Sequence, residues 1–360
     1  MTHTVTLIPG DGIGPEVMSA MKACIDAAGV SIDWEEQLLG QTAFDKCGCL
    51  VPEETIASIK ANKVAIKGPC TTPVGSGFRS VNVALRKTLD LYINLRPAKS
   101  LGIVPYFDNV DIVLFRENTE DLYAGVEFDA GDPECRKLLN YIRENKLGSW
   151  DDETAISLKI ISKKGSERII RAAFEYAAAH GRERVSAVHK ANIMKFSDGL
   201  FLKTFYQIAE EYDGKVKCGD YIVDALMMQL VQHPDQMDVL VMPNLYGDIA
   251  SDLCAGLIGG LGIAPGANIG KDFAVFEPVH GSAPDVAGRN CANPTASILS
   301  GIMMLEHLGE TAAAEKLHKA VVEVITEKKS VTCDLLCETD SSKAVSTTEF
   351  AMAVIDRMKA

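Results

Sequence analysis

Short apolar runs alternate with longer helical patterns along most of the chain, and this alternation is the feature that most constrains the fold. The runs have the length of single buried strands and lie at residues 4–8, 64–67, 91–95, 110–115, 185–189 and 238–242. Helical patterns lie at residues 15–28, 166–179, 199–212 and 294–308. Strands that alternate with helices predict an α/β protein with a substantially parallel sheet.

The composition describes a soluble globular protein with a sizeable core, since 47% of the 360 residues are hydrophobic and 24% are charged. A net charge of -13 predicts no nucleic-acid partner, because binding to phosphates requires a basic face. The ten cysteines are scattered without a C-x-x-C pattern, so we expect reduced thiols rather than disulfides or a zinc site.

The sequence starts with a strand-like run, and neither a basic leader nor an apolar signal segment is visible before it. Its longest apolar stretch, at residues 253–265, contains many glycines and is too short to span a bilayer. We therefore expect a cytoplasmic protein with no membrane partner. An organelle enzyme whose leader has been removed would have the same appearance.

A glycine loop follows the first run and reads Gly10-Asp-Gly-Ile-Gly14. It invites comparison with the dinucleotide fingerprint G-x-G-x-x-G, but Pro15 occupies the position of the third glycine. The mismatch argues against an ordinary Rossmann fold. The glycines still permit backbone angles and close approaches that side chains would prevent.

An acidic pair lies between an apolar run and a glycine-rich turn. If a helix begins near Gly247, Asp248 and Asp252 stand at positions i and i+4 on one face of it. Two like-charged carboxylates so placed are destabilising unless a cation lies between them, and their hard oxygens suit Mg²⁺ or Mn²⁺. A solvated first helical turn, where the helix dipole favours Asp, is the alternative. Asp224 is a third carboxylate within an apolar stretch, and burying it requires a partner.

Four arginines accompany the apolar segments of the first third of the chain: Arg79, Arg86, Arg96 and Arg116. Arginines at the ends of buried strands point into the crevice of an α/β sheet. Guanidinium groups bind carboxylates in a bidentate manner. Their convergence favours a small polyanionic substrate over separate structural salt bridges.

Several long motifs resemble the isocitrate/isopropylmalate dehydrogenase family, and the resemblance covers essentially the whole chain. The motifs are residues 7–16, 116–120, 244–252, 259–270 and 276–285. The family has a two-lobed α/β fold that is not a Rossmann fold. The resemblance implies a large domain from residues 1–91 and 259–360, and a small domain from 92–120 and 164–258. The polar segment within residues 121–163 then corresponds to a clasp-like arm in a homodimer with shared active sites.

Within this family the NAD-linked isocitrate branch is the nearest match. It implies NAD-dependent, metal-assisted oxidative decarboxylation of isocitrate to 2-oxoglutarate and CO₂. The substrate-binding residues implied are Ser80, Asn82, Arg86, Arg96, Arg116 and Asn192. Ser80 and Asn82 match the pair that contacts the extra carboxylate of isocitrate, where isopropylmalate enzymes carry apolar residues.

The resemblance gives Lys190 the role of the catalytic lysine that manages the hydroxyl proton, and Tyr123 the role of the acid that protonates the enol. Asp224, Asp248 and Asp252 would hold Mg²⁺ or Mn²⁺, some of them from the neighbouring subunit.

The resemblance also implies a set of cofactor-binding residues. They are Thr71, Thr72, Glu277, His280, Gly281, Ser282, Ala283, Pro284, Asp285, Val286 and Asn293. NADP-dependent members carry a lysine and a tyrosine at positions 285 and 286. A carboxylate at position 285 suits the free ribose 2′-hydroxyl of NAD and repels the phosphate of NADP. Cys333 and Cys337 replace a tyrosine and an arginine of the NADP type, which also favours NAD.

Two alternatives remain open. Residues 94–100 and the Glu-Pro-Val-His sequence at 277–280 resemble homoisocitrate dehydrogenases equally well, so homoisocitrate or 3-isopropylmalate is an alternative substrate. A catalytically silent regulatory subunit is the second alternative, although such subunits lose members of the lysine, tyrosine and aspartate set that this chain retains.

Overall fold

Ten strands of the described chain form one mixed sheet in the order β2-β1-β3-β12-β11-β4-β5-β10-β8-β9. The structure is a computed structural model and describes residues 2–71, 80–103, 107–336 and 341–359. The strands of the sheet are β1 (His3–Ile8), β2 (Ile32–Glu36), β3 (Val64–Lys67), β4 (Ile93–Lys99), β5 (Asp111–Glu117), β8 (Arg184–His189), β9 (Lys217–Ile222), β10 (Val239–Met242), β11 (Pro265–Ile269) and β12 (Ala274–Pro278).

Helices cover both faces of this sheet. The α-helices of the described residues are α1 (Gly14–Ala28), α2 (Gln41–Cys47), α3 (Glu53–Asn62), α4 (Val81–Thr88), α5 (Pro133–Glu144), α6 (Lys163–Ala179), α7 (Ser197–Ala209), α8 (Val223–Gln232), α9 (Asn244–Ile258), α10 (Thr295–His307), α11 (Thr311–Glu327) and α12 (Thr347–Lys359), of which α5 lies on an arm away from the sheet. In the described residues no helix is both long and apolar enough to cross a membrane.

Side chains on successive strand positions point to opposite faces, and each face packs against its own helices. In β5, Ile112 and Leu114 join the hydrophobic cluster that includes α1, α8, α9 and α10, whereas Val113 and Phe115 join the cluster of α6 and α7. A third cluster packs α3 and α4 against β1, β3 and β12. The first of these clusters contains residues from both predicted lobes, so the two lobes share one continuous core.

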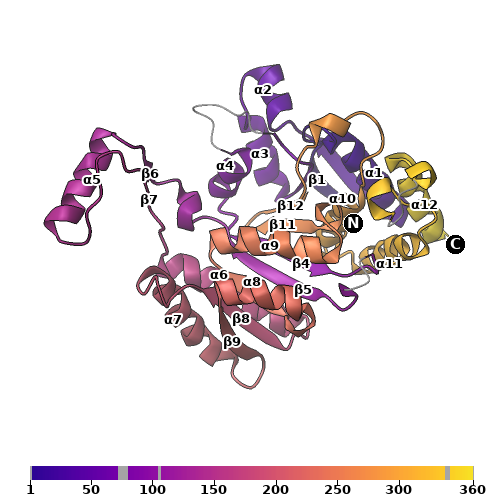
Figure 1. Cartoon of the computed structure of the whole chain (residues 1–360). Coiled ribbons are helices and arrows are strands. Elements are labelled where there is room, and N and C mark those ends of the chain that lie inside the picture. The colour runs from indigo at the N-terminus through magenta and orange to yellow at the C-terminus, as the bar shows by residue number, and fades with distance from the viewer. Residues whose placement is uncertain (1, 72–79, 104–106, 337–340, 360) are drawn as a thin grey trace.

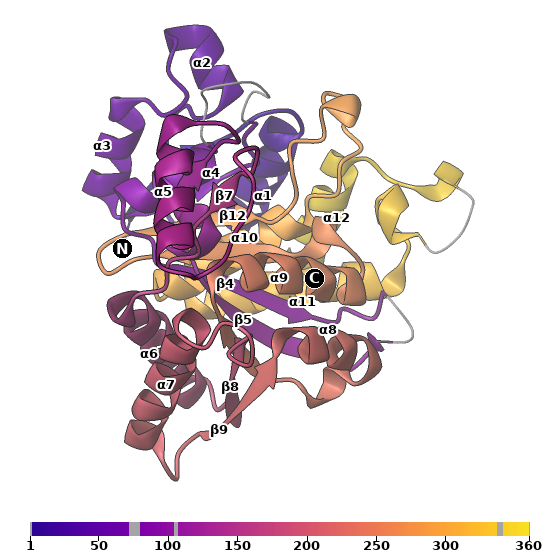
Figure 2. The same ribbon diagram turned by 60° about the vertical axis from the view of Figure 1, so that its left-hand side comes forward.

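Two parallel blocks flank an antiparallel centre. Strands β2, β1, β3 and β12 are mutually parallel, and so are β5, β10, β8 and β9. The pairs β12–β11, β11–β4 and β4–β5 are antiparallel, and Figure 2 shows β4 and β5 passing through the middle of the molecule. The prediction of a substantially parallel sheet is therefore correct for the flanks and wrong for the centre. The described residues of the connections β4–β5 and β11–β12 contain no crossover helix, and such connections give antiparallel pairs.

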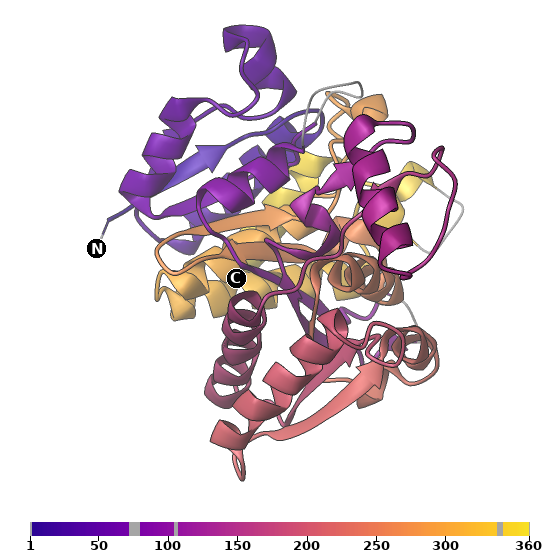
Figure 3. The same ribbon diagram turned by 90° about the vertical axis from the view of Figure 1, so that its left-hand side faces the viewer.

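The segment around α5 projects away from the rest of the protein, as the magenta ribbon in Figure 1 shows, and in Figure 3 the same arm lies in front of the body. A two-stranded ribbon of β6 (Glu127–Phe128) and β7 (Ile156–Ser157) connects this arm to the body. Tyr141, Leu147 and Trp150 expose more than half of their surface on it. The domain boundaries expected from the sequence remain a prediction.

Candidate active site

The antiparallel centre of the sheet brings polar side chains from distant segments into one region. Asn94 on β4 lies opposite Arg116 on β5 and opposite Asn268 on β11. Asn94 Nδ2 donates to Asn268 Oδ1 (2.8 Å), and Asn268 Nδ2 donates to Glu277 Oε1 (2.7 Å). All four side chains are buried, so the sheet register itself places a chain of polar groups at the middle of the molecule.

Glu277 on β12 is held by two cations. Lys67 Nζ lies 2.6 Å from Glu277 Oε2, and Arg86 Nη2 lies 3.2 Å from Oε1. Burial alone would raise the pKa of Glu277, but Lys67 and Arg86 hold it well below its ordinary value. Burial would in turn lower the pKa of Lys67, and the Glu277 carboxylate more than offsets this and raises it. The ion pair therefore fixes Arg86. Glu277, which the sequence predicts to contact the cofactor, is already bonded to Lys67, Arg86 and Asn268.

The other two arginines meet the acidic pair of α9. Arg116 is 1% exposed; its Nε donates to Asn244 Oδ1 (2.9 Å) and its Nη1 to Asp248 Oδ1. Arg96 Nη1 lies 3.4 Å from Asp252 Oδ1. Asp248 and Asp252 thus face the arginines from one side of α9, as their spacing predicts, although Asp252 is 58% exposed.

The helix that carries the acidic pair begins at Asn244, earlier than the predicted start near Gly247. Asp121 Oδ2 accepts a hydrogen bond from Leu245 N–H (2.9 Å) in its first turn. Asp121 is distant from α9 in the sequence, so the local pattern around Gly247 does not predict this helix start. Asp248 and Asp252 still share one face.

Tyr123 lies beside these groups in the short helix Asp121–Ala124. Its hydroxyl donates to Asp248 Oδ2, and the Arg116 guanidinium stacks 4.9 Å from the centre of its ring. Burial, followed by the hydrogen bond to Asp248, raises the pKa of Tyr123. Its phenol therefore stays protonated and can serve as a proton donor.

The arginines repel one another. Burial, and then the charges of Arg116 and Arg86, lower the pKa of Arg96 to about 10. Burial and Arg86 likewise lower the pKa of Arg116. Burial would raise the pKa of Asp248, but Arg116, Tyr123 and Arg96 hold it below its ordinary value. This region of concentrated positive charge favours an incoming polyanion.

A cavity of about 120 Å³ opens between the arginines and the end of β12, and Asn82, Arg86, Asn94, Arg96 and His280 are among its lining residues. Each of these five has a buried polar atom with no hydrogen-bond partner in the described part of the chain. Buried polar groups are normally paired. The unsatisfied atoms therefore indicate a polar ligand with several donors and acceptors.

His280 supplies an acceptor to this cavity. Its Nδ1 lies 3.0 Å from the Gly281 carbonyl, and because a carbonyl can only accept, Nδ1 carries the proton. Burial lowers the pKa of His280, so the ring is neutral. Nε2 is then free to accept a hydrogen bond from a hydroxyl or amide of a ligand.

Of the other predicted cofactor residues that the structure describes, residues 281–286 lie on the loop after β12, Asn293 lies next to α10, and Thr71 lies on the segment after β3. Thr71 Oγ1 and Ser282 Oγ are 2.7 Å apart, which brings two of the predicted segments together. Asp285 is exposed and Val286 is partly buried. Asn293 Nδ2 donates to Asp334 Oδ2 (2.8 Å). Thr72, Arg79 and Cys337 lie outside the described residues.

Lys190 and Asp224 form a separate group. Lys190 Nζ donates to Asp224 Oδ1, and the Asp224 side chain is 67% exposed. Among the described residues no three His, Cys, Asp or Glu side chains gather closely enough to hold a metal ion. Asp248 and Asp252 have the hard oxygens that suit Mg²⁺ or Mn²⁺. These two residues fit such an ion if a third carboxylate joins them from elsewhere.

A buried ionic cluster supports both predicted catalytic residues. Lys159 Nζ lies 2.7 Å from Asp121 and 3.7 Å from Asp198, and both carboxylates are fully buried. Asp198 Oδ2 accepts from Lys190 N–H (2.7 Å) and from the Tyr246 hydroxyl (3.0 Å). The cluster ties the Lys190 backbone to the turn that carries Tyr123.

Several of these supporting residues were not predicted from the sequence, namely Lys67, Asn244, Asn268, Lys159 and Asp198. Lys67 and Asn268 lie in strands and are 1% and 2% exposed. A polar residue within an apolar run, such as Lys67 or Asn268, could have indicated a buried supporting group. Two predicted substrate residues, Ser80 and Asn192, are exposed on this chain, whereas Asn82 lines the cavity.

The fold and the cavity define a two-lobed α/β protein with a positively charged site for a small polyanion. A family model described as isocitrate/isopropylmalate dehydrogenase matches residues 4–354. The chain belongs to the isocitrate/isopropylmalate dehydrogenase family, a family of decarboxylating dehydrogenases. The predicted family and the predicted non-Rossmann fold class are confirmed.

Solved and curated relatives agree with this assignment. The crystal structure of isocitrate dehydrogenase from Methylococcus capsulatus has a TM-score of 0.89 and 49% identity, covering 99% of this chain and 100% of that chain. The Arabidopsis thaliana protein "isocitrate dehydrogenase [NAD] catalytic subunit 5, mitochondrial" is 47% identical over 99% of this chain and 88% of its own length. A chloroplastic 3-isopropylmalate dehydrogenase of Solanum tuberosum is 46% identical over 90% of this chain and 85% of its own length. Other relatives are named as NADP-dependent enzymes or regulatory subunits.

Gly247 on α9 provides a test of the Arg116 position. A Cβ at position 247 would lie 2.4 Å from Arg116 Cγ, so Gly247→Ala must displace the guanidinium. We expect the KM for the acidic substrate to rise by about tenfold or more. Steady-state kinetics measures this effect. Helix propensity favours alanine over glycine by about 1 kcal/mol, so a loss of binding would not come from a weakened helix.

Gly256→Ala is the matched control on the same helix, because a Cβ at position 256 would have nothing within 4 Å of it. We expect unchanged kinetics and a free energy of unfolding higher by up to about 1 kcal/mol. Equal KM values in the two variants would contradict the role given to Arg116.

Proposed function

We propose that the chain catalyses the NAD-dependent oxidative decarboxylation of isocitrate to 2-oxoglutarate and CO₂, assisted by Mg²⁺ or Mn²⁺. The observation that carries the proposal is the cavity whose unsatisfied polar atoms come from Asn82, Arg86, Asn94, Arg96 and His280. A substrate with three carboxylates matches a site where Lys67 and Arg86 share the single carboxylate of Glu277, and where the Nε groups of Arg86 and Arg96 are buried without a partner in the described residues.

The arginines would bind and orient the substrate carboxylates, and Asn82 would provide an amide where an alkyl group of 3-isopropylmalate would have to fit. The Asn82 Nδ2 group could donate to a third carboxylate, whereas an apolar group would leave the buried amide unpaired at a cost of about 1–3 kcal/mol. This supports isocitrate over 3-isopropylmalate. It does not separate isocitrate from homoisocitrate, which remains the alternative substrate.

Asp248 and Asp252, with Asp224, would hold the divalent metal, which when bound supplies Lewis-acid polarisation of the substrate's 2-hydroxyl oxygen. Lys190 Nζ would take up the hydroxyl proton. Tyr123, whose raised pKa keeps it protonated, would donate a proton to the enol carbon after CO₂ has left. The Asp248 carboxylate holds the Tyr123 hydroxyl in place for this transfer.

NAD would lie along the loop from His280 to Val286 and beside Asn293, and it supplies the hydride acceptor. The exposed Asp285 carboxylate suits a free ribose 2′-hydroxyl and would repel a 2′-phosphate. The buried Nε2 of His280 offers a hydrogen-bond acceptor to the cofactor. These features support NAD over NADP.

A homodimer with shared active sites is part of the proposal. Lys190 and Asp224 pair with each other, apart from the arginines and from Asp248, so one chain does not assemble the full predicted set. A partner subunit would complete each site. The exposed apolar residues of the arm fit an intersubunit contact. The cytoplasmic location expected from the sequence is also proposed, and fractionation of the native cells would test it.

The substrate and cofactor are tested by kcat/KM values of the purified homomer for isocitrate, homoisocitrate and 3-isopropylmalate, each with NAD and with NADP. We expect isocitrate with NAD to be preferred by about tenfold or more, and chelation of divalent metal to abolish the activity. Asp285→Lys combined with Val286→Tyr should shift the preference toward NADP. An inactive homomer would instead favour the regulatory-subunit alternative, and a preference for homoisocitrate or NADP would overturn that part of the proposal.

Shared active sites are tested by mixing two inactive variants. Lys190→Met removes the proton-handling group, and Asp248→Asn removes a metal ligand that we place in the opposite half of the site. Random reassociation makes about half of the dimers hybrids with one intact site of two, so about a quarter of wild-type activity should return. Hybrids that form, as native mass spectrometry would detect, but stay inactive would contradict the shared site.

A further inference from the structure

The glycine loop, residues 9–14, does not form a nucleotide cradle in this structure but contacts two other loops directly. Asp11 N–H donates to the Pro69 carbonyl (2.7 Å), and Ile13 N–H donates to the Ser282 carbonyl (2.9 Å). The first contact reaches the segment that leads to Thr71. The second reaches the loop after β12, which the proposed function assigns to the cofactor.

Two glycines make these contacts possible. Gly12 has a φ of +59°, and a Cβ there would lie 2.0 Å from the Ser282 carbonyl oxygen. Gly10 has a φ of +80°, and a Cβ there would lie 2.3 Å from the Pro69 carbonyl oxygen. The two glycines that match the dinucleotide fingerprint are therefore needed here for the close approach of protein backbone.

The Asp11 side chain adds a third segment. It is 5% exposed, and its Oδ1 accepts from Thr42 N–H (2.8 Å) and Thr42 Oγ1–H (2.6 Å). Its Oδ2 accepts from Gln41 N–H (2.9 Å) and Thr71 N–H (2.7 Å). Gln41 and Thr42 begin α2, so one carboxylate caps this helix and holds Thr71 at the same time.

The Thr71 and Ser282 hydroxyls close the arrangement at 2.7 Å from each other. Asp11 thus contacts Thr71 through its side chain, and the backbone of its loop contacts Ser282. A buried carboxylate that accepts four hydrogen bonds is held rigidly. Moving it would displace both segments.

We propose that Asp11 is a positioning residue that joins the two cofactor-binding segments, at Thr71 and Ser282, and so sets the affinity for NAD. The inference rests on the proposed function, because that function places the cofactor on these segments. Both carboxylate oxygens of Asp11 are already bonded to protein groups, so the proposal gives them no contact with substrate or cofactor. Its effect is on cofactor affinity and not on the arginine cluster.

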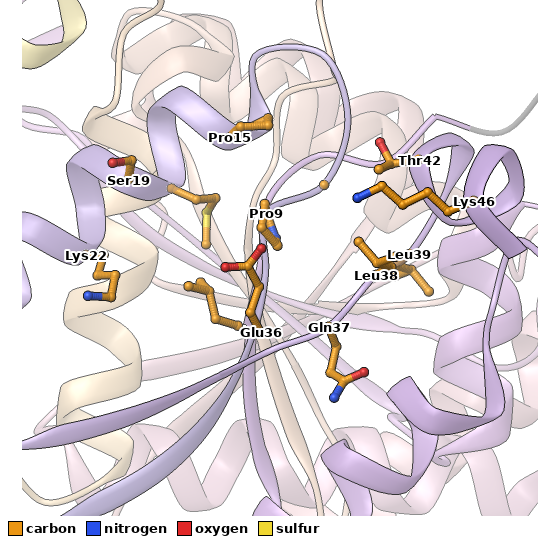
Figure 4. A pocket seen from close by; sticks show the side chains of 13 residues that line it. Pro9, Pro15, Ser19, Lys22, Glu36, Gln37, Leu38, Leu39, Thr42 and Lys46 are labelled. Atoms are coloured by element: carbon orange, nitrogen blue, oxygen red, sulfur yellow. The ribbon is translucent and has the colours of Figure 1, made fainter.

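The outer side of this arrangement borders a pocket of about 380 Å³, which Pro9, Gly10 and Thr42 help to line. In Figure 4 the Thr42 side chain lies at the edge of this pocket, beside Lys46. A change at Thr42 therefore meets open space rather than packed core. Thr42→Val is a mild variant that removes the Oγ1 hydrogen bond and keeps the backbone bond to Asp11.

The experiment measures NADH binding by fluorescence titration, together with KM for NAD, KM for isocitrate and thermal unfolding. Asp11→Asn replaces one acceptor oxygen by a donor that faces N–H groups. We expect it to weaken NADH binding by about tenfold, while the KM for isocitrate changes by less than about twofold. Thr42→Val should weaken NADH binding by about two- to threefold, and it tests the inference if Asp11→Asn does not fold.

Asp238→Asn is the matched control. Asp238 also accepts two backbone hydrogen bonds, from Glu183 and Arg184 (2.8 Å each), but it contacts neither cofactor segment. We expect it to lower thermal stability and leave NADH binding unchanged. Wild-type NADH affinity in Thr42→Val and in a folded Asp11→Asn, or an equal loss in Asp238→Asn, would overturn the inference alone. A wild-type protein that binds no NADH would overturn the proposed function and this inference with it.

Discussion

Arg86, Arg96 and Arg116 converge on one largely buried region, and the surrounding structure is arranged to tolerate and use their charge. Burial and mutual repulsion lower the pKa of Arg96 to about 10, so the free protein holds these groups at a cost. Ion pairs with Glu277 and Asp248 offset part of this cost of burying like charges together. The remaining positive charge is what a polycarboxylate neutralises, and binding energy for the substrate follows from relief of the repulsion among the arginines.

The mixed sheet is what makes this convergence possible. Antiparallel pairing of β4 with β5 and with β11 places Asn94 opposite Arg116 and Asn268. A fully parallel sheet would need crossover helices at its centre and would separate these residues. In the flanking parallel blocks, Lys67 is the last residue of β3 and Lys190 directly follows β8. The support for Glu277 and Arg86 and the proton-handling lysine therefore come from different halves of the sheet.

Much of this architecture could be predicted from the sequence, because it depends on local periodicity. The six apolar runs correspond to strands, and the i, i+4 spacing placed Asp248 and Asp252 together. The antiparallel centre, the early start of α9 and the four partners of Asp11 depend on contacts between distant segments, which periodicity does not encode. The pairing of Asp224 with Lys190, instead of with Asp248, has the same origin.

The central claim is that the arginine cluster is a binding site for a polycarboxylate, and ligand-dependent unfolding tests it most directly. A ligand that binds only the folded protein raises its stability by about 2.7 kcal/mol at one hundred times Kd. We predict that isocitrate with Mg²⁺ raises the midpoint of thermal unfolding by several degrees over chloride of equal ionic strength, and that Arg96→Met abolishes most of the difference. Equal midpoints in isocitrate and chloride, or an undiminished shift in Arg96→Met, would contradict the account.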